Sequence, residues 1–492
     1  GIISLMASFK TDESFLEKIS LGAIGTQQVF KKLVELGHQP IELERGSMNY
    51  KIWKKIKIKR IRVPDIICVD NGIRIESRAK SKLEITMSHS LNDPARGWDA
   101  DLKNEDYVAL IACKKGDLSP VDWIPNSPVQ FISVKQLRES FQRKEVITEK
   151  AKGVQEGSEV RITWLSCIAG KDLTITEVTE DKIVAKPAIG RTSSCRLKRN
   201  KGGMSIVLKP LVKVGDKVLE NQIVASVVPV EYDIPKGKVD SNYFVENLSN
   251  LNHNERYAAA KALRFFNDKK VIAALKAKVG TPDEHIYVRL EAAASLAILG
   301  EAEGYLFIEE SLTDQYLQNV LESVIVLNEI KSERACKLLC DILLNEAFDP
   351  EIRAGAAWGL GEQQNKNALT AIVSSFNAVD ESIRIEAARA LAKLTKNYSV
   401  DILKKFTSAS SAEKPGVAWA LGKSNSITLD QLLNSIQDLD SKEWVSYIIG
   451  TQGEEKYIAE IEKIKAKDPE VYFAVTLLWK IMTSWIYDLK EY

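Results

Sequence analysis

Four charged side chains at residues 65–80 have the types and spacing of a metal-dependent hydrolytic site. Asp65 follows a proline and precedes an apolar run, and Glu76, Arg78 and Lys80 then follow at intervals of two. Side chains two residues apart on a strand share a face. Two carboxylates on one face repel each other unless a proton or a cation compensates them, and oxygen ligands of this kind suit Mg²⁺ or Mn²⁺. The pattern therefore predicts a carboxylate-bound cation that acts on a phosphodiester.

The pair Asn71-Gly72 predicts how the two carboxylates are brought together. Asn-Gly between β-rich runs is typical of a two-residue hairpin turn. That register places Asp65 opposite Arg78 and diagonal to Glu76, all on one polar face. The opposite face becomes the core, and its members are Ile66, Cys68, Ile73, Ile75, Ser77 and Ala79. The alternative is an ordinary charged hairpin.

The Pro64-Asp65 pair and Glu76 resemble the motif of the PD-(D/E)xK nuclease superfamily. The resemblance implies that Asp65 and Glu76 hold Mg²⁺ or Mn²⁺ and that a basic side chain assists the attack of water on a phosphodiester. The family's lysine stands two residues after the second acid, where this chain has Arg78, and a lysine follows at Lys80. Arginine does not readily accept a proton. Either Lys80 has taken over the catalytic role, or Arg78 only binds phosphate.

The element order expected for residues 1–145 suits an α/β domain of this kind. Apolar spacing and Gly37 predict the first helix and its end. Glu42 or Glu44, from the first strand, is expected to supply a further acid. The expected elements are a helix at 14–38, a strand at 39–46, a basic strand at 51–62, the hairpin, a strand at 102–115 and a helix at 134–144.

Basic side chains near the hairpin predict contact with DNA. The segment 51–62 has seven basic residues in twelve, and residues 1–145 have 24 basic against 19 acidic side chains. Such a strand binds phosphate, or it is a charged edge that prevents aggregation. In the next loop Trp98 would stack on a base or fill the core, and His89 is expected to be a buried, hydrogen-bonded group. The candidate nucleic-acid contacts are Lys55, Lys57, Lys59, Arg96, Trp98, Arg196, Lys198 and Arg199.

Residues 146–240 predict a small all-β domain, because short alternating runs are separated by Gly, Asp and Pro. The passage 181–226 is similar to the barrel-sandwich hybrid region of bacterial RNA polymerase beta subunits, through a basic strand, a proline-bearing strand and the Gly215-Asp216 turn. This resemblance implies a fold and no catalytic role. The basic stretch 196–201 is either a phosphate contact or a solvated strand and turn.

Alanine-rich helical segments recur in residues 241–492. Their arginines are separated by 33, 64 and 31 residues, which is one, two and one units of about 32: Arg256, Arg289, Arg353 and Arg384. Such a period marks stacked helix pairs. The segments resemble HEAT repeats of the short type found in bilin-lyase-like proteins, over about 245–425. The end of the chain predicts capping helices with Trp479 and Trp485.

The sequence thus predicts a multidomain chain with a PD-(D/E)xK-like α/β domain at 1–145, a barrel-sandwich-like all-β domain at 146–240 and a HEAT-repeat α-solenoid at 241–492. The expected function is a metal-dependent DNA endonuclease whose repeats bind a protein partner or self-associate, an architecture that would suit bacterial defence against foreign DNA. The first alternative is a non-catalytic nucleic-acid-binding adaptor with a degenerate nuclease domain. The second is a repeat scaffold that binds no nucleic acid.

Composition narrows the remaining possibilities. The longest apolar runs are shorter than the ~20 residues of a membrane span, and the first ten residues lack the pattern of a secretory signal, so we expect a cytoplasmic protein. The six cysteines and four histidines do not have zinc-site spacing, and reduced thiols are expected. A GxxxxGK[ST] phosphate loop does not occur in the sequence.

Overall fold

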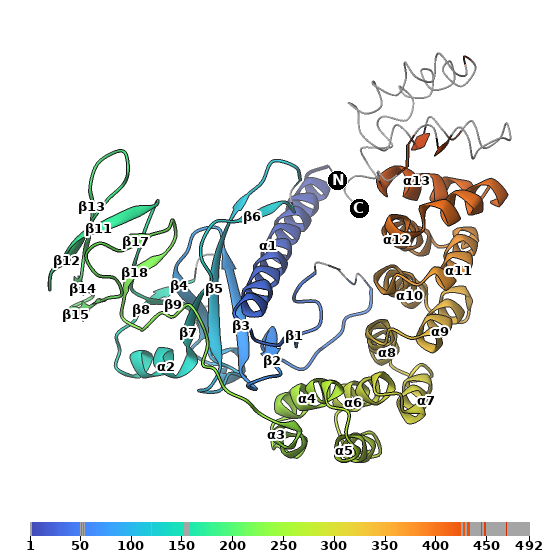
Figure 1. Cartoon of the computed structure of the whole chain (residues 1–492), viewed down its shortest axis with the longest axis horizontal. Coiled ribbons are helices and arrows are strands. Elements are labelled where there is room, and N and C mark those ends of the chain that lie inside the picture. The colour runs from blue at the N-terminus through green and yellow to red at the C-terminus, as the bar shows by residue number, and fades with distance from the viewer. Residues whose placement is uncertain are drawn as a thin grey trace. The chain divides into compact units, whose positions relative to one another are not determined.

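The computed structural model describes residues 2–49, 51, 53, 55–119, 121–151 and 158–424, together with a few short stretches up to residue 469, and side chains from residue 15 onward. The chain divides into two compact units (Figure 1). The first contains Gly1–Ile52 and Arg60–Ala274, and the second contains Trp53–Lys59 and Leu275–Tyr492. This division differs from the three expected domains. Trp479 and Trp485 lie outside the described residues.

A six-stranded mixed sheet lies at the centre of the first unit (Figure 1). Its order is β1-β2-β3-β5-β6, and β7 also pairs with β5. The first three strands are antiparallel neighbours, whereas β3 and β5 run parallel. The strands are β1 (Pro40–Glu42), β2 (Ile66–Cys68), β3 (Arg74–Lys80), β5 (Tyr107–Lys115), β6 (Trp123–Pro125) and β7 (Gln130–Ser133).

Helix α1 (Ile2–Glu35) covers one face of this sheet, and it begins before the helix expected at 14–38 and ends three residues earlier. Val29 and Leu33 are fully buried against Ile75 of β3 and other apolar side chains of the strands. A Cβ added to Gly25 would lie 2.3 Å from the Cβ of Ala79, so glycine allows the helix to approach the sheet closely. Gly37 has a φ of 87°, the left-handed conformation that ends many helices, as expected.

The other face of the sheet shares one core with the region expected to be a separate β domain. Buried residues from Leu83 to Val228 form a single cluster. One cause is the pairing of β4 with β9 along six residue pairs, from Ile85 opposite Trp164 to Ser90 opposite Glu159. The elements on this side are β4 (Ile85–Ser90), η1 (Pro94–Arg96), α2 (Val134–Gln142), β8 (Ile147–Lys150) and β9 (Glu159–Trp164).

Residues 166–226 fold into short antiparallel strands, as their alternating pattern predicts. Cys167 and Cys195 form a disulfide, whereas we expected every cysteine to be reduced. The strands are β10 (Ser166–Ile168), β11 (Leu173–Val178), β12 (Lys182–Lys186), β13 (Ser193–Arg196), β14 (Lys198–Lys201), β15 (Met204–Val207), β16 (Lys209–Pro210), β17 (Lys217–Val218) and β18 (Ile223–Ser226).

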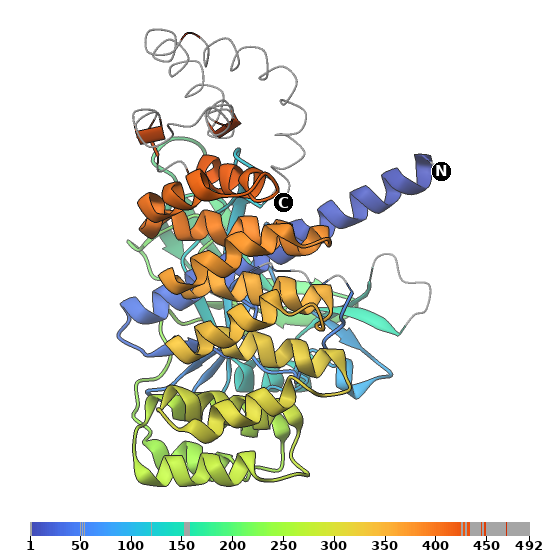
Figure 2. The same cartoon turned by 90° about the vertical axis from the view of Figure 1, so that its right-hand side faces the viewer.

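Helices follow from residue 241 onward. The pair α3 (Ser241–Asn247) and α4 (His253–Ala262) belongs to the first unit, and α5 (Lys269–Val279) spans the boundary between the units. In the second unit, successive helices stack in layers (Figure 2). They are α6 (Ile286–Ile298), α7 (Ala302–Ser311), α8 (Leu317–Glu329), α9 (Glu333–Leu344), α10 (Pro350–Gln363), α11 (Leu369–Ser374), α12 (Glu381–Ser408) and α13 (Lys414–Ser424).

The arginines that define the repeat period bind the carbonyl groups that end the preceding segment. Arg289 donates from Nε and Nη2 to the carbonyl oxygen of Val279, at 3.0 and 2.8 Å. Arg353 donates from Nε to the carbonyl oxygen of Leu343 at 2.9 Å. The last carbonyls of a helix have no intrahelical partner, and a cation is favoured at that end. Arg256 and Arg384 donate instead to loop carbonyls just before their own helices, those of Asn250 and Leu251 and those of Ala378 and Val379. The period therefore reflects an arginine that binds the chain preceding its helix, and that chain is a helix end in two of the four repeats.

The basic segment 51–62 is not a strand in its described residues. Ile56 and Ile61 are buried and Lys55, Lys57 and Lys59 are exposed, so burial partly follows the alternation that suggested a strand. The residues Trp53–Lys59, which we call the strap, belong instead to the second unit. No helix in the described part of the chain is long and apolar enough to cross a membrane.

Candidate functional site

The hairpin between β2 and β3 has a four-residue loop, Val69–Gly72, and not the predicted two-residue turn. Cys68 N donates to Ile73 O at 2.9 Å, and Gly72 N donates to Cys68 O at 2.8 Å. Of the four loop residues only Gly72 has a positive φ, whereas the predicted turn needs two. The Asp70 carboxylate holds the wider loop by accepting a hydrogen bond from Gln39 N at 2.8 Å.

The register of the hairpin differs from the predicted one by two residues. Ile67 lies opposite Arg74, whereas the prediction placed it opposite Glu76. Because faces alternate with a period of two, this shift keeps every side chain on its expected face. Extended by one residue beyond its last pair, the observed pairing sets Asp65 opposite Glu76 and no longer opposite Arg78. The wider loop thus brings the two candidate ligands closer together.

Three carboxyl groups, those of Glu44, Asp65 and Glu76, influence one another on this polar face. Glu44 and Asp65 share a side-chain hydrogen bond. Burial raises the pKa of Asp65 well above its usual value, and the charges of Glu76 and Glu44 raise it further. Burial raises the pKa of Glu76 to about 7, although Arg78 opposes the shift. Burial also raises the pKa of Glu44.

Of the two acids near the first strand, Glu44 and not Glu42 lines the cavity and interacts with Asp65. The backbone N–H groups of Leu43 and Glu44 both donate to the carbonyl oxygen of Asp65, at 2.8 and 3.2 Å, which extends the pairing beyond β1. The Glu42 carboxylate instead accepts hydrogen bonds from Gly46 N and Met48 N at 3.3 and 3.2 Å. Glu42 therefore stabilises the following loop.

The two basic residues of β3 have different surroundings. Lys80 Nζ donates to both the carbonyl and the hydroxyl oxygen of Thr86, the former at 3.0 Å. Burial lowers the pKa of Lys80 to about 8. Arg78 Nη2 lies 3.5 Å from Glu76 Oε1, and its side chain is 41% exposed. Lys80 is therefore suited to exchange a proton near neutral pH, and Arg78 to contact an anion.

A cavity of about 960 Å³ opens over this face. Glu44 and Glu76 line it, whereas Asp65 is not among the lining residues, and its carboxyl group shares a hydrogen bond with Glu44 and accepts one from Ser77 N at 2.7 Å. Two further acids, Asp101 and Glu159, line the cavity with them, and six basic side chains outnumber the four acids. The basic residues that line the cavity are Lys18, Arg62, Arg78, Lys80, Arg96 and Arg161.

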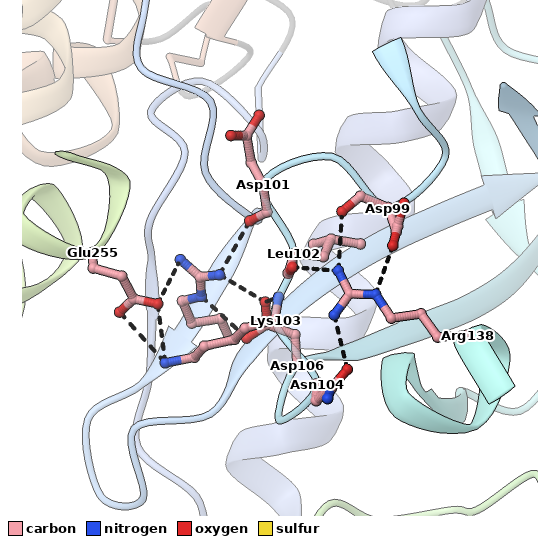
Figure 3. A network of polar contacts seen from close by, with 9 residues as sticks. Asp99, Asp101, Leu102, Lys103, Asn104, Asp106, Arg138 and Glu255 are labelled. Carbon is pink, nitrogen blue, oxygen red and sulfur yellow. Dashed lines mark hydrogen bonds and ion pairs between the residues drawn. The ribbon is translucent and has the colours of Figure 1, made fainter. Parts of the chain in front are cut away.

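A buried ion pair anchors the start of β3. Arg74 donates from Nε and Nη2 to the Asp106 carboxylate at 3.1 and 2.7 Å, and both side chains are almost fully buried. Glu255 Oε1 lies 3.6 Å from Arg74 Nη1 and 3.2 Å from Lys103 Nζ. Figure 3 shows Glu255, Lys103 and Asp106 in this network. Asp106 was not predicted from the sequence. It precedes β5, and its position beside Arg74 follows only from the parallel pairing of Ile75 with Tyr107.

The loop after β4 places its candidate nucleic-acid contacts differently. Trp98 is 5% exposed, and its ring lies 4.9 Å from that of Trp164, so the indole fills the core and its faces are not open to a base. His89 Nδ1 accepts a hydrogen bond from Trp98 N at 3.1 Å, the buried polar role expected for it. Arg96 is exposed and pairs with Glu159 at 2.8 Å at the cavity wall.

The remaining basic candidates lie away from the cavity lining. Lys55, Lys57 and Lys59 are exposed in the strap, which belongs to the second unit, whereas the carboxylates belong to the first. Arg199 is half-buried and donates from Nε to the carbonyl oxygen of Arg196 at 3.0 Å. Arg196 and Lys198 are exposed, and Lys198 pairs with Asp181 at 2.9 Å. Among the predicted contacts in the first unit, Arg96 and Trp98 line the cavity together with Glu44 and Glu76, whereas Arg196, Lys198 and Arg199 do not.

The chemistry of these carboxylates suits a hard divalent cation, but few of them are placed to bind one. They are oxygen donors whose mutual repulsion a cation would relieve, which is the donor set that Mg²⁺ prefers. Among the described residues, however, no group of three or more His, Cys, Asp or Glu side chains is arranged to hold a metal ion. A cation here would therefore take one or two carboxylates and complete its shell with water or substrate oxygens, as Mg²⁺ commonly does.

Comparison with known proteins identifies the class of the helical array alone. A family model for HEAT repeats matches residues 336–422. This confirms the predicted HEAT repeats over part of the C-terminal half. None of the curated proteins matches the sequence.

Several solved structures are distantly similar to about half of the chain. A complex of CpcE and CpcF of phycocyanin lyase from Nostoc sp. PCC7120 is 16% identical, with a TM-score of 0.25, over 49% of this chain and 96% of that one. Human deoxyhypusine hydroxylase in complex with glycerol is 15% identical, with a TM-score of 0.20, over 44% and 84%. An engineered protein is 19% identical, with a TM-score of 0.20, over 50% and 97%.

Proposed function

We propose that this protein is a metal-dependent DNA endonuclease with a HEAT-repeat scaffold. The observation that carries the proposal is the polar face of the β2–β3 hairpin, where Asp65, Glu76 and Glu44 adjoin a cavity lined by cations. Buried acids that compete for protons are typical of sites that hold a cation or move a proton. A polyanion fits the cation-lined mouth, since phosphate contacts dominate nucleic-acid affinity.

In this mechanism each side chain has a separate task. Asp65 and Glu76 would hold Mg²⁺ or Mn²⁺, which when bound polarises the scissile phosphate and stabilises the charge that develops on it. Arg78, exposed beside Glu76, contacts a neighbouring phosphate. Lys80, with its pKa lowered to about 8, takes a proton from the attacking water. Glu44 holds Asp65 in place through their shared hydrogen bond.

The HEAT repeats would bind a partner protein or a second copy of the chain. Residues 241–492 have 36 acidic against 28 basic side chains, whereas residues 1–145, which contain the candidate site, have a basic excess. An array of stacked helices offers an extended surface for a protein or for a second copy of the chain. Such a combination would suit a bacterial defence against foreign DNA that acts when a partner binds.

The test is cleavage of supercoiled plasmid by the purified chain in Mg²⁺ or Mn²⁺. We expect nicked or linear DNA from the wild type and loss of at least 100-fold in rate for Asp65→Asn and Glu76→Gln. Glu42→Gln is the matched control, because Glu42 lies only two residues before Glu44, at the end of β1, but supports a loop. Equal cleavage by the two site variants and the wild type would remove the proposal.

A second candidate is a nucleic-acid-binding adaptor that does not cleave. It is favoured by the geometry of Lys80, whose ammonium is engaged by Thr86, and by the limited number of acids arranged for a metal. In that case the wild type binds labelled DNA without cleaving it in either metal, and Arg78→Met weakens binding. The two functions are separated by one titration of DNA binding in EDTA, followed by addition of metal.

A further inference from the structure

The strap meets α10 at a position where this repeat differs from its neighbours. Two residues after the repeat arginine, the helices α4, α6, α10 and α12 carry Ala258, Glu291, Gly355 and Glu386 in turn. Five residues after the same arginine, the four helices carry Lys261, Ala294, Trp358 and Arg389. In α12 the two positions form an ion pair, with Arg389 Nη1 2.9 Å from Glu386 Oε1. In α10 they are a glycine and a tryptophan.

Glycine at this position makes room for an aromatic ring of the strap. A Cβ added to Gly355 would lie 3.3 Å from two ring atoms of Trp53, so the indole rests directly against the α10 backbone. The Trp53 and Trp358 rings meet edge to face, with centroids 6.1 Å apart and planes at 85°. This is a preferred aromatic geometry. Gly355 and Trp358 therefore both contact the indole of Trp53, and we call this position on α10 the slot.

A carboxylate beside the slot binds the backbone that follows the tryptophan. Glu351, in the first turn of α10, accepts hydrogen bonds from Lys55 N at 3.1 Å and from Ile56 N at 2.6 Å. Glu351 and Ile56 are both buried. A charged acceptor with two backbone donors gives strong, directional bonds that do not depend on the side chains of the bound segment.

Charge around the strap is complementary. The three lysines of its described residues are exposed, and Lys55 lies near enough to Asp380 to help lower the pKa of that carboxyl, after the larger effect of the hydrogen bond from Ser382. The array as a whole has an acidic excess. An extended, lysine-rich segment therefore fits this surface, and the tryptophan fixes its register.

We propose that α10 carries a recognition slot for an extended tryptophan-bearing basic segment, which the strap occupies within the chain and which a partner protein with the same chemistry takes by displacing it. The slot recognises the indole through Gly355 and Trp358 and the following backbone through Glu351. The strap is then an exchangeable occupant of the array.

The test uses the full chain and a fluorescein-labelled peptide with the sequence of residues 51–62, KIWKKIKIKRIR. Trp53→Ala empties the slot, so we expect this variant to bind the peptide at least 10-fold more tightly than the wild type does. The same peptide with alanine in place of its tryptophan keeps every charge and should bind the variant at least 10-fold more weakly. Equal binding of both peptides would show attraction by charge alone and would overturn the proposal.

Two further variants separate the slot from a general loss of folding. Adding Gly355→Glu to Trp53→Ala introduces the residue that α6 and α12 carry at this position and should abolish peptide binding, while circular dichroism and thermal unfolding match those of the parent. In the wild type, excess peptide should increase tryptic cleavage within residues 54–62 several-fold, and the alanine peptide should not. Binding that survives Gly355→Glu, or a strap whose cleavage the peptide does not change, would contradict an exchangeable occupant.

Discussion

Strand β3 carries two groups of buried charges that are compensated in different ways. At its start, Arg74 and Asp106 form two direct hydrogen bonds, and Glu255 and Lys103 extend the network. In its middle, the charge of Glu76 acts on Asp65 and that of Glu44 acts on Glu76, and Arg78 Nη2 lies 3.5 Å from Glu76 Oε1. The first group has a cation placed for each buried acid, whereas the second has more acids than close cations.

The pKa shifts express this difference. The hydrogen bond and charge of Asp106 raise the pKa of Arg74 in spite of the opposing effect of burial, so pairing outweighs desolvation there. For Asp65 and Glu76 desolvation dominates and the neighbouring acids add to it. Paired charges hold a fold together, and buried charges left short of a partner are typical of sites that bind a ligand. The comparison therefore separates the support of the hairpin from its candidate chemistry.

The largest expected effect is on the stability that the buried Arg74–Asp106 ion pair gives to the first unit. Arg74→Met leaves the Asp106 carboxylate buried without its main partner, which should lower the free energy of unfolding by about 3–5 kcal/mol. The measurement is a urea titration of the full chain, from which the free energy of unfolding of the first unit is taken. The double variant Arg74→Met/Asp106→Leu removes both charges and should lose less than the sum of the single variants. A loss below 1 kcal/mol for the single variant would mean that the pair is not buried as described.

The next effect concerns proton transfer by Lys80. If cleavage is observed, Lys80→Met should lower its rate by about 10²-fold or more, the usual contribution of a positioned base. Because the pKa of Lys80 is lowered to about 8, its neutral form gains population as the pH rises through 8, and the wild-type rate should rise over the same interval. The rate is measured from pH 6.5 to 9.

Lys80→Arg distinguishes a base from a fixed charge. Arginine keeps the cation but does not give up its proton, so a base role predicts that this variant is as slow as Lys80→Met. Recovery of most of the rate by arginine, with the pH dependence unchanged, would place Lys80 as a phosphate contact and return the base to another group.

The elements of the first unit were largely predictable, because local patterns determine them. The first helix and its end at Gly37, the short strand at Pro40–Glu42, the strand at Tyr107–Lys115 and the helix at Val134–Gln142 all occur near their expected places. The faces of the hairpin were also correct, since they depend only on alternation. The HEAT repeats followed from the period of an arginine that binds carbonyls of the preceding chain in each of the four matching helices.

What failed depended on contacts between distant residues. The hairpin register shifted by two because Asp70 is held by Gln39, and nothing in residues 63–85 signals that bond. Segment 51–62 has the alternation of a strand, but its partner is a helix of the array, through Glu351. Asp106 reaches Arg74 only after two strands pair in parallel. Trp98 could be read as a base-stacking residue or as core, and its contact with Trp164 places it in the core.

A smaller effect should appear in the metal-free protein as its pH changes. The pKa of Glu76 is raised from 4.5 to about 7, so the folded state binds this proton more tightly than the unfolded state does. Its stabilising contribution is therefore complete below pH 4.5 and is lost as the pH rises to about 7. Glu76→Gln removes this loss and should raise the free energy of unfolding by about 1–3 kcal/mol at pH 8 in EDTA, relative to its effect at pH 5.

Adding Mg²⁺ to the same unfolding measurement tests whether the ionised acids bind a cation. A cation that binds the ionised acids stabilises the folded wild type, by about 1.4 kcal/mol at ten times its dissociation constant, and should do so at pH 8 more than at pH 5. Asp65→Asn and Glu76→Gln should lose this metal-dependent increase. Denaturation curves with and without Mg²⁺ that coincide for the wild type would count against a cation on this face.

The smallest effect is expected in the helical array, where compensation is a single local cap repeated along the chain. Arg353→Met removes the hydrogen bond from Nε to the carbonyl oxygen of Leu343 and should lower the free energy of unfolding of the array by about 1–2 kcal/mol. Lys337→Met is the control, because its ion pair with Asp341 lies on an exposed helix face and should contribute less than about 0.5 kcal/mol. Equal losses from both would mean that the repeated arginine acts only as surface charge. A loss confined to Arg353→Met would show that one hydrogen-bonded cation per helix end contributes to the stability of the array, whereas the hairpin relies on a buried ion pair within a wider network.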